Sequence, residues 1–278
     1  MLLRCADREL DLATPVVMGV LNITPDSFSD GGHFVDHPAA FARALRMLEE
    51  GATIIDVGGE STRPGALPVS AEEELQRVIP VVRSLVAGGA LVSIDTSKPE
   101  VIRAALEGGA QIVNDVYALR RPGALEAAAR GAAAVCVMHM QGEPRSMQQA
   151  PRYDDVVREV AGFLAERVAA CESAGIARDR LLVDPGFGFG KTVAHNLELL
   201  RNLNEIAPPG LPILAGLSRK SMLATLTGRP VEARLAGSLA LAFAALEGGA
   251  RIIRCHDVAE TCDVVKVWTA LRRKGEAS

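Results

Sequence analysis

Polar residues of types that bind or activate small molecules recur at the ends of eight short apolar segments of this sequence. They include carboxylates, amides, hydroxyls and cations. The set consists of Asn22, Asp56, Glu60, Asp95, Asn114, Asp115, His139, Asp184, Ser218, Lys220, Arg254 and His256. One such residue alone is more often a cap or a loop residue, but a set that follows consecutive apolar segments indicates one shared site.

The candidate residues divide into two chemical groups. The acceptors suit the N–H donors of a flat heterocycle, and they are Asp95, Asn114 and Asp184. The cations suit a phosphorylated group, and they are Arg63, Lys220, Arg254 and His256. Ser61 and Thr62 add hydroxyl donors for phosphate oxygens. The amide oxygen of Asn22 suits a hard cation such as magnesium, with phosphate and water completing the shell.

The glycine-rich segment DPGFGFGKT (184–192) invites comparison with nucleotide-binding loops. A P-loop requires glycine five residues before the Gly190–Lys191 pair, where this chain has Pro185, and GFGFG does not match GxGxxG. Gly186, Gly188 and Gly190 are therefore interpreted as positions where the backbone approaches a ligand closely.

The eight apolar segments predict the strands that position these residues. They cover residues 16–22, 53–60, 91–97, 111–116, 134–140, 181–186, 212–220 and 251–257. Their continuous apolar character is typical of parallel strands buried on both faces. Helical periodicity between or after them is clearest in three segments, 70–86, 154–175 and 257–273. The first of these begins with Ser70 and Glu73 at capping-box spacing.

An internal repeat supports the order of strands and helices. EGATIID (50–56), GGAQIVN (108–114) and GGARIIR (248–254) share a Gly-Ala pair and a polar residue five positions after the glycine. The glycine suits a helix C-terminus, and the polar residue falls at the carboxyl end of a strand. The pattern predicts an α/β fold, a single-domain (β/α)8 TIM barrel with parallel strands. An open doubly wound sheet is the alternative.

Length and composition agree with one enzyme-sized domain spanning residues 1–278, with a core at about 14–272. A net charge of -4 gives no reason to expect nucleic acid as a partner. The longest uncharged stretch, Leu12 to Pro25, is too short to span a membrane, and the charged start MLLRCADREL is unlike a signal peptide. Five cysteines without a CxxC pair argue against a disulfide framework or a zinc site, so a reduced, cytoplasmic protein is expected. Cys136 and Cys255 are expected to be buried core residues on strands.

Five motifs together resemble those of the dihydropteroate synthase family of pterin-binding enzymes. They are NITPDSFSDGG, ESTRPGA, DPGFGFGK, LSRKSM and RCHDV, and the resemblance covers about residues 14 to 272. It implies a transferase of folate biosynthesis that is a sulfonamide target. Such an enzyme condenses 6-hydroxymethyl-7,8-dihydropterin diphosphate with 4-aminobenzoate, forming 7,8-dihydropteroate and releasing diphosphate.

The resemblance also implies roles for individual residues. For the pterin diphosphate the implied residues are Thr62, Asp95, Asn114, Asp184, Lys220, Arg254 and His256. For 4-aminobenzoate they are Phe28, Arg63, Pro64, Phe189 and Ser218. Catalytic roles are implied for Asp95, Lys220, Arg254 and His256. Asn22 is the implied ligand of the cofactor Mg2+, and a homodimer is the implied assembly.

The chemistry implied by these parts centres on the leaving group. An arylamine is a neutral nucleophile at pH 7 and needs no strong general base. The difficult event is cleavage of the pterin methylene C–O bond, and our hypothesis is a dissociative path with cations stabilising diphosphate. Two alternatives are a pterin-dependent corrinoid methyltransferase and a non-catalytic pterin-binding subunit. The phosphate-binding residue types disfavour the first, and the intact NITPDSF and RxH motifs disfavour the second.

Overall fold

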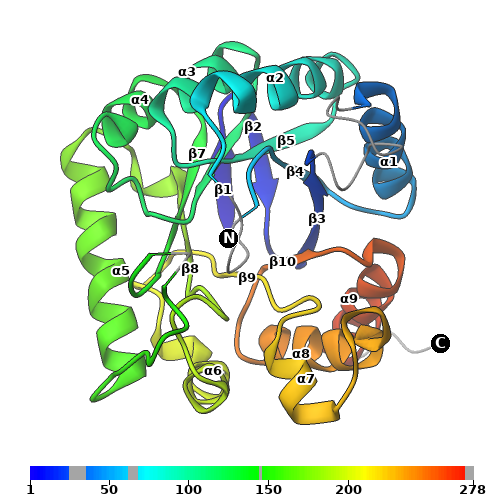
Figure 1. Cartoon of the computed structure of the whole chain (residues 1–278), viewed down its shortest axis with the longest axis vertical. Coiled ribbons are helices and arrows are strands. Elements are labelled where there is room, and N and C mark those ends of the chain that lie inside the picture. Colours follow the sequence, from blue (N-terminus) through cyan, green and yellow to red (C-terminus); the bar gives the residue numbers. More distant parts are fainter. Residues whose placement is uncertain (25–35, 62–67, 144–145, 273–278) are drawn as a thin grey trace.

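The computed structural model describes residues 1–24, 36–61, 68–143 and 146–272. Within them, eight parallel strands form the centre of the molecule (Figure 1). The strands are β3 (Val16–Asn22), β4 (Ile54–Gly58), β5 (Leu91–Asp95), β6 (Ile112–Asp115), β7 (Ala134–Met138), β8 (Leu181–Asp184), β9 (Leu214–Ala215) and β10 (Ile252–Cys255). Each falls inside one of the predicted apolar segments.

The strands close into a barrel. Neighbours along the chain pair in parallel from β3 through β8, and β10 pairs with both β3 and β9. A parallel bridge between Val183 and Ile213 joins β8 to β9, with the Val183 N–H donating to the Pro212 carbonyl at 3.0 Å. The closed order confirms the predicted (β/α)8 barrel and excludes the open doubly wound sheet.

Helices surround the strands on the outside of the barrel (Figure 1). They are α1 (His37–Glu49), α2 (Ala71–Ala87), α3 (Pro99–Glu107), α4 (Ala124–Arg130), α5 (Val156–Ser173), α6 (Val193–Arg201), α7 (Met222–Thr227), α8 (Leu235–Glu247) and α9 (Val258–Arg272). Ser70 caps α2 by accepting from the Glu73 N–H, whereas the Glu73 side chain pairs with Arg77. Across the described ranges, every helix is too short or too polar to cross a membrane.

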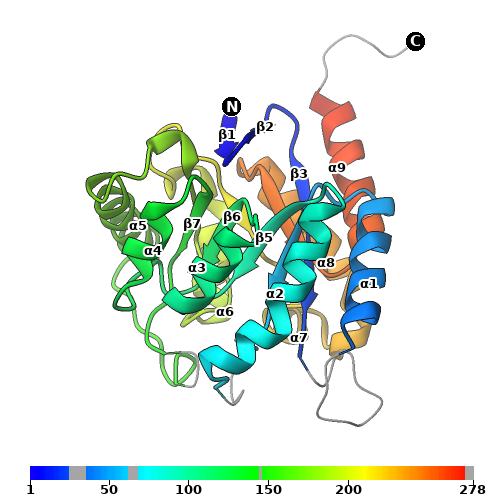
Figure 2. The ribbon, with the colours of Figure 1, turned by 90° about the horizontal axis from the view of Figure 1, so that it is seen from above.

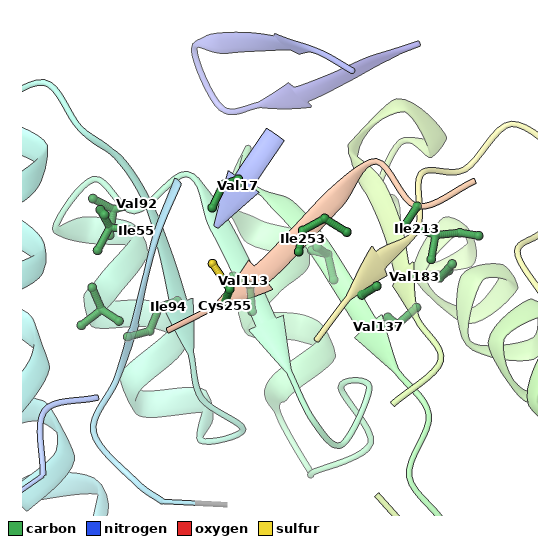
Figure 3. Packing of buried hydrophobic residues seen from close by; sticks show 14 of the residues in the cluster. Val17, Ile55, Val92, Ile94, Val113, Val137, Val183, Ile213, Ile253 and Cys255 are labelled. Carbon is green, nitrogen blue, oxygen red and sulfur yellow. The ribbon is translucent and has the colours of Figure 1, made fainter. Parts of the chain in front are cut away.

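Alternate strand residues face opposite sides of the sheet and build two separate apolar layers. Outward-facing residues pack against the helices, and Figure 3 shows Val17, Ile55, Val92, Val113, Val137, Val183 and Ile253 among them. Inward-facing residues fill one end of the barrel interior, and they include Met18, Ile54, Leu91, Ile112, Leu182, Leu214 and Ile252. Cys136 and Cys255 are buried on β7 and β10, as predicted.

An antiparallel hairpin that the sequence analysis did not anticipate covers this apolar end. Its strands are β1 (Leu2–Cys5) and β2 (Arg8–Asp11), and Figure 2 shows them at one end of the barrel with α7 at the other. Leu3, Cys5 and Leu12 are fully buried and pack against the inward-facing apolar residues. The hairpin therefore closes the amino end of the barrel and leaves the carboxyl end for the site.

The inward positions change from apolar to polar within two residues along several strands. Ile54 is followed by Asp56, Ile112 by Asn114, Leu182 by Asp184 and Ile252 by Arg254. Because side chains at i and i+2 face the same side of a strand, each polar side chain stands directly above an apolar one. The polar residues of several strands therefore meet on an apolar floor at the carboxyl end of the barrel.

Candidate active site

The centre of the site is Arg254 on β10, held by carboxylates from two other strands. Its Nε donates to Asp56 Oδ2 at 2.6 Å, and its Nη2 donates to Asp95 Oδ2 at 2.7 Å. Asn114 Nδ2 also donates to Asp56 Oδ2, at 3.2 Å. Asp56, Asn114 and Arg254 are the three polar residues of the internal repeat, so repetition of one βα unit brings them into direct contact.

Burial and neighbouring charges shift the pKa values of Arg254 and Asp95. Asp56 is fully buried, while the Arg254 side chain is 21% exposed and can still reach a bound molecule. Burial disfavours the Arg254 cation, but the Asp56 and Asp95 carboxylates prevail and raise its pKa above the ordinary value. Burial raises the pKa of Asp95 to about 7, with the Arg254 cation opposing the shift. Arg254 is thus a permanent cation beside a carboxyl group that titrates near neutrality.

A recess extends from this cluster toward β8 and the glycine-rich segment. It is lined by Asp95, Asn114, Val116, Met138, Asp184, Phe187, Phe189, Gly216, Lys220 and Arg254. Asp184 Oδ1 accepts from the Gly186 N–H at 2.7 Å, and Lys220 Nζ lies 4.3 Å from the centre of the Phe189 ring. The recess therefore combines apolar walls with acceptors and two cations, which suits a flat polar heterocycle.

Burial shifts the pKa values of Asp184 and Lys220, and the opposite charge of each group partly counteracts the shift of the other. Burial raises the pKa of Asp184, although the Gly186 N–H and the neighbouring cations counteract it. Burial lowers the pKa of Lys220 to about 8, with Asp184 acting in the opposite direction. Lys220 consequently changes charge just above neutral pH.

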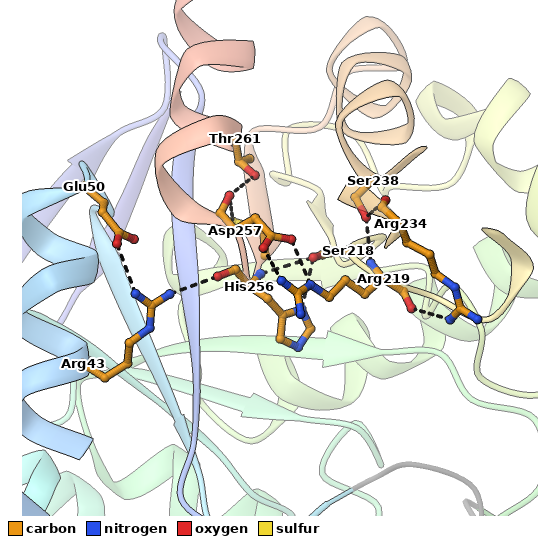
Figure 4. Close-up of polar contacts among 10 residues, drawn as sticks. Arg43, Glu50, Ser218, Arg219, Arg234, Ser238, His256, Asp257 and Thr261 are labelled. Carbon is orange, nitrogen blue, oxygen red and sulfur yellow. Dashed lines mark hydrogen bonds and ion pairs between the residues drawn. The ribbon is translucent and has the colours of Figure 1, made fainter. Parts of the chain in front are cut away.

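His256 and Ser218 form a pair beside the recess (Figure 4). Ser218 Oγ lies 3.1 Å from His256 Nδ1 and accepts from the His256 backbone N–H at 3.2 Å. Arg43 on α1 donates to the His256 carbonyl at 3.3 Å and pairs with Glu50. Ser218 thereby contacts the imidazole, while Arg43 holds the backbone of His256 directly after β10.

The turn between Ser218 and Lys220 has an unusual backbone conformation. Arg219 lies in the left-handed region at φ 57°, which is costly for a residue with a side chain. Its N–H donates to Ser238 Oγ at 2.9 Å, its carbonyl accepts from Arg234 at 3.1 Å, and its guanidinium pairs with Asp257 (Figure 4). These contacts hold the turn in which Ser218 contacts His256 and Lys220 lines the recess.

Asn22 ends β3 beside Gly58 and Asp95. A Cβ atom on Gly58 would lie 3.7 Å from Asn22 Oδ1 and 3.4 Å from Asp95 Cβ. The absence of a side chain at position 58 thus leaves space over the amide oxygen. Among the residues that the structure describes, no three His, Cys, Asp or Glu side chains are grouped as metal ligands.

The structure gathers many of the predicted site residues, with two separate groupings. Asp95, Asn114, Asp184, Phe189, Lys220 and Arg254 share the recess, whereas Ser218 and His256 pair beside it. Phe28, Thr62, Arg63 and Pro64 lie outside the described residues. Three strand-end residues have contacts elsewhere. Glu60 pairs with Lys98, Asp115 accepts from the Tyr117 N–H, and His139 contacts Lys191.

Sequence reasoning gave no specific role to two residues that organise the site. Asp56 appeared only as one strand-end residue, although it is the shared partner of Arg254 and Asn114. The signal was present, because all three occupy the same position of the internal repeat. Lys191 was noted only as part of the rejected P-loop pattern, yet it is buried with four close acceptor atoms.

The barrel with this polar recess matches a known class of protein. A family model described as "Pterin binding enzyme" matches residues 18–256, and the chain belongs to that family. Curated relatives in it are dihydropteroate synthases. That of Escherichia coli K12 is 56% identical over 94% of this chain and 93% of its own length, and that of Haemophilus influenzae is 53% identical over 94% and 95%. The resemblance seen in the motifs is confirmed.

Solved structures give the same result. Dihydropteroate synthase of Yersinia pestis in a sulfonamide complex superposes with a TM-score of 0.93 at 50% identity, covering 98% of this chain and 99% of that one. The Xanthomonas albilineans enzyme with 4-aminobenzoic acid gives 0.92 at 53% identity, covering 99% of both chains. The Burkholderia cenocepacia enzyme with 7,8-dihydropteroate gives 0.90 at 49% identity, covering 98% and 96%.

The charge states of the recess predict how pterin affinity depends on pH. If pterin N–H groups donate to the Asp95 carboxylate, affinity should rise as pH increases through about 7, where Asp95 loses its proton. If the Lys220 cation also contributes, affinity should fall again above about 8. Calorimetric titration with 6-hydroxymethyl-7,8-dihydropterin from pH 6 to 9 should therefore give a maximum between these limits. Asp95→Asn should abolish the low-pH limb, and Lys220→Arg should abolish the high-pH limb.

Proposed function

We infer that the protein is a dihydropteroate synthase, a transferase that moves a pterinylmethyl group from diphosphate to an arylamine. Its substrates are 6-hydroxymethyl-7,8-dihydropterin diphosphate and 4-aminobenzoate, and its products are 7,8-dihydropteroate and diphosphate. The observation that carries this function is the recess lined both by the acceptors Asp95, Asn114 and Asp184 and by the cations Lys220 and Arg254. It combines hydrogen-bond acceptors for a pterin with positive charge for a leaving phosphate.

The acceptors bind the polar edge of the pterin. Asp184 and Asn114 take its N–H and amino groups, and Asp95 lies where positive charge would develop on the ring. Lys220, whose Nζ lies over the face of the Phe189 ring, approaches the pterin ring from that side of the recess. Burial of these groups supports the assignment, because charge-assisted hydrogen bonds are stronger where water is excluded.

Arg254 and His256 stabilise the leaving group. In the reaction the bond between the pterin methylene carbon and the diphosphate oxygen breaks, and its electron pair leaves with diphosphate. The arylamine nitrogen bonds to the methylene carbon and then gives a proton to solvent. The support for Arg254 in this role is its permanent charge, which two buried carboxylates maintain and orient. Preorganised charge of this kind requires no rearrangement as the bond breaks.

The residues for the other parts of the substrates follow the family assignment. Phe189 and Ser218 border the 4-aminobenzoate, together with Phe28, Arg63 and Pro64, and Thr62 contacts the diphosphate. The positions of Phe189 and Ser218 support this assignment. Phe189 lines the recess, and Ser218 contacts His256, two residues after Arg254. An arylamine held there would face the pterin methylene.

Magnesium fits the residues at the end of β3. Asn22 would hold Mg2+ through Oδ1. Because residue 58 is glycine, no Cβ atom lies next to this oxygen. Magnesium keeps several waters and is often bound through few protein ligands plus substrate phosphates, so one amide oxygen suffices. When bound, the ion would neutralise charge on the diphosphate.

The test is an assay of both products from both substrates. We expect dihydropteroate and diphosphate in equal amounts, with neither formed when 4-aminobenzoate is omitted. Pterin binding without diphosphate release would contradict the enzyme assignment and favour a non-catalytic binding subunit. Methyl transfer without diphosphate release would favour the corrinoid methyltransferase. Titrating Mg2+ in the same assay tests the metal assignment, because Asn22→Ala should raise the concentration for half-maximal rate.

We further propose a cytoplasmic homodimer. Support for the dimer comes from the outer surface near α7 and α8, where Leu226 and Val231 are exposed and Leu235 and Leu239 are only partly covered. Such clustered apolar surface is typical of subunit contacts. Support for the cytoplasm is that all five cysteines are unpaired thiols. Light scattering on the purified protein and fractionation of cells test the two proposals.

A further inference from the structure

Lys191, at the end of the glycine-rich segment, is one of the most deeply buried cations of the described chain, at 3% exposure. Its Nζ donates to the Gly186 carbonyl at 2.9 Å and to the Phe189 carbonyl at 3.1 Å. It also lies 2.9 Å from His139 Nδ1 and 3.4 Å from the His139 carbonyl. Burial and the Lys191 charge lower the pKa of His139 to about 3, so the imidazole is neutral and can accept. Burial lowers the pKa of Lys191 itself to about 7, with Asp184 acting in the opposite direction, and in either charge state its N–H bonds have partners among these atoms.

The glycine-rich segment is pressed against the end of β7. Gly186 and Gly190 adopt left-handed backbone conformations at φ 69° and 63°. A Cβ on Gly186 would lie 1.9 Å from the His139 carbonyl oxygen, and one on Gly190 would lie 2.3 Å from the Gln141 carbonyl oxygen. Carbonyl groups from both segments therefore converge in a buried space. The Gly186 carbonyl also accepts from the Phe189 N–H at 3.1 Å, so Lys191 matters most for the His139 and Phe189 carbonyls, and a buried carbonyl without a donor is costly.

The same segment supplies three features of the recess. The Gly186 N–H donates to Asp184 Oδ1 at 2.7 Å, and Phe187 and Phe189 line its wall. The Phe189 ring also lies against Lys220 Nζ. Lys191 is not among the residues that line the recess. Lys191 therefore acts on a bound substrate indirectly, through the backbone that it holds and through its charge, which helps to lower the pKa of Asp184.

We propose that Lys191 is a positioning residue of the pterin site. Its ammonium group ties the carbonyls of Gly186 and Phe189 to His139, and this orients the Asp184 acceptor and the Phe189 ring toward the pterin. The inference rests on the proposed function, since it names what holds that site in its binding geometry. It gives a role to the lysine that follows a glycine-rich segment without a P-loop or GxGxxG pattern.

The test compares Lys191→Met with a matched control at the opposite end of the barrel. Arg180 is similarly buried and donates to the Gly131 and Ala133 carbonyls at 2.8 and 2.9 Å. Both Lys191→Met and Arg180→Met remove a buried cation from backbone carbonyls and should lower the melting temperature. Only Lys191→Met should weaken calorimetric binding of 6-hydroxymethyl-7,8-dihydropterin, by about tenfold to a hundredfold.

Steady-state kinetics separates positioning from general damage. Lys191→Met should raise KM for the pterin diphosphate far more than KM for 4-aminobenzoate. Lys191→Gln, which keeps two N–H donors, should recover part of the affinity and provides the measurement if Lys191→Met does not fold. Wild-type pterin affinity in a folded variant, or an equal loss in Arg180→Met, would overturn the proposal. Failure of the wild-type protein to bind the pterin would instead contradict the proposed function.

Discussion

Arg254→Ala should lower the turnover number by about three orders of magnitude or more while reducing pterin affinity much less. Removing one preorganised group that stabilises developing negative charge typically costs about 10²- to 10³-fold. Here the loss should be greater, because Asp56 and Asp95 then remain near the leaving diphosphate without their cation. Single-turnover rates measure the chemical step, and calorimetry with the diphosphate-free pterin measures the affinity.

The stability of the Arg254→Ala variant needs its own control. Removing one partner of a buried ion pair costs about 3–5 kcal/mol, since the remaining charge is unpaired. The double variant Arg254→Ala/Asp56→Asn should recover much of that stability without recovering turnover. Arg254→Lys keeps the charge but lacks the fork that bonds both carboxylates, so it should recover only part of the rate. Equal losses of turnover and pterin affinity would show that Arg254 binds the ring rather than the leaving group.

The barrel could be predicted from the sequence because its strands leave a strong pattern. Parallel strands buried on both faces are continuously apolar, and all eight fell within predicted segments. The Gly-Ala repeat added the connection between helix end and strand end. Gly51, Gly109 and Gly249 indeed adopt left-handed conformations after α1, α3 and α8. Local backbone requirements of this kind are legible in sequence because few residues other than glycine satisfy them.

The amino-terminal hairpin could not be predicted in the same way. Its strands have four residues each and carry Arg4, Arg8 and Glu9 among the apolar residues. Its turn places Ala6 in the left-handed region at φ 57°, where glycine or asparagine would have given a recognisable signal. The hairpin is stabilised by tertiary contacts, because Leu3 and Cys5 are buried in the end of the barrel.

The site shows the same division between local and tertiary information. Residue types at strand ends predicted several of the side chains that gather, since parallel strands place their carboxyl ends together, although Glu60, Asp115 and His139 have contacts elsewhere. The contacts between individual side chains depend on how the strands and loops come together in the folded barrel. Asp56 serves Arg254 from a distant strand, and Lys191 joins carbonyls from two separate segments. The internal repeat marks Asp56 and Arg254 as equivalent positions, but the sequence spacing does not say which residue each one contacts.

Asp184→Asn should weaken binding of the diphosphate-free pterin by about one to two orders of magnitude and leave the fold intact. A hydrogen bond to a charged group contributes roughly 1.5–3 kcal/mol, and each 1.4 kcal/mol corresponds to about tenfold in affinity. The substitution isolates the charge, because asparagine keeps the Oδ1 atom that accepts from the Gly186 N–H. The backbone of the glycine-rich segment should therefore keep its position.

The matched control for Asp184→Asn is Asp115→Asn, which alters another fully buried carboxylate at a strand end. Asp115 accepts from the Tyr117 and Leu119 N–H groups at 2.8 and 2.9 Å and does not line the recess. Asp115→Asn should unfold at a lower temperature, because asparagine cannot accept both backbone N–H groups, whereas Asp184→Asn should unfold near the wild-type temperature. Only Asp184→Asn should lose pterin affinity in calorimetry. Its affinity for 4-aminobenzoate should stay near that of the wild-type protein, since we propose that Asp184 binds the pterin and not the arylamine. Unchanged pterin affinity in folded Asp184→Asn would remove Asp184 from the binding site and transfer its role to Asp95 and Asn114.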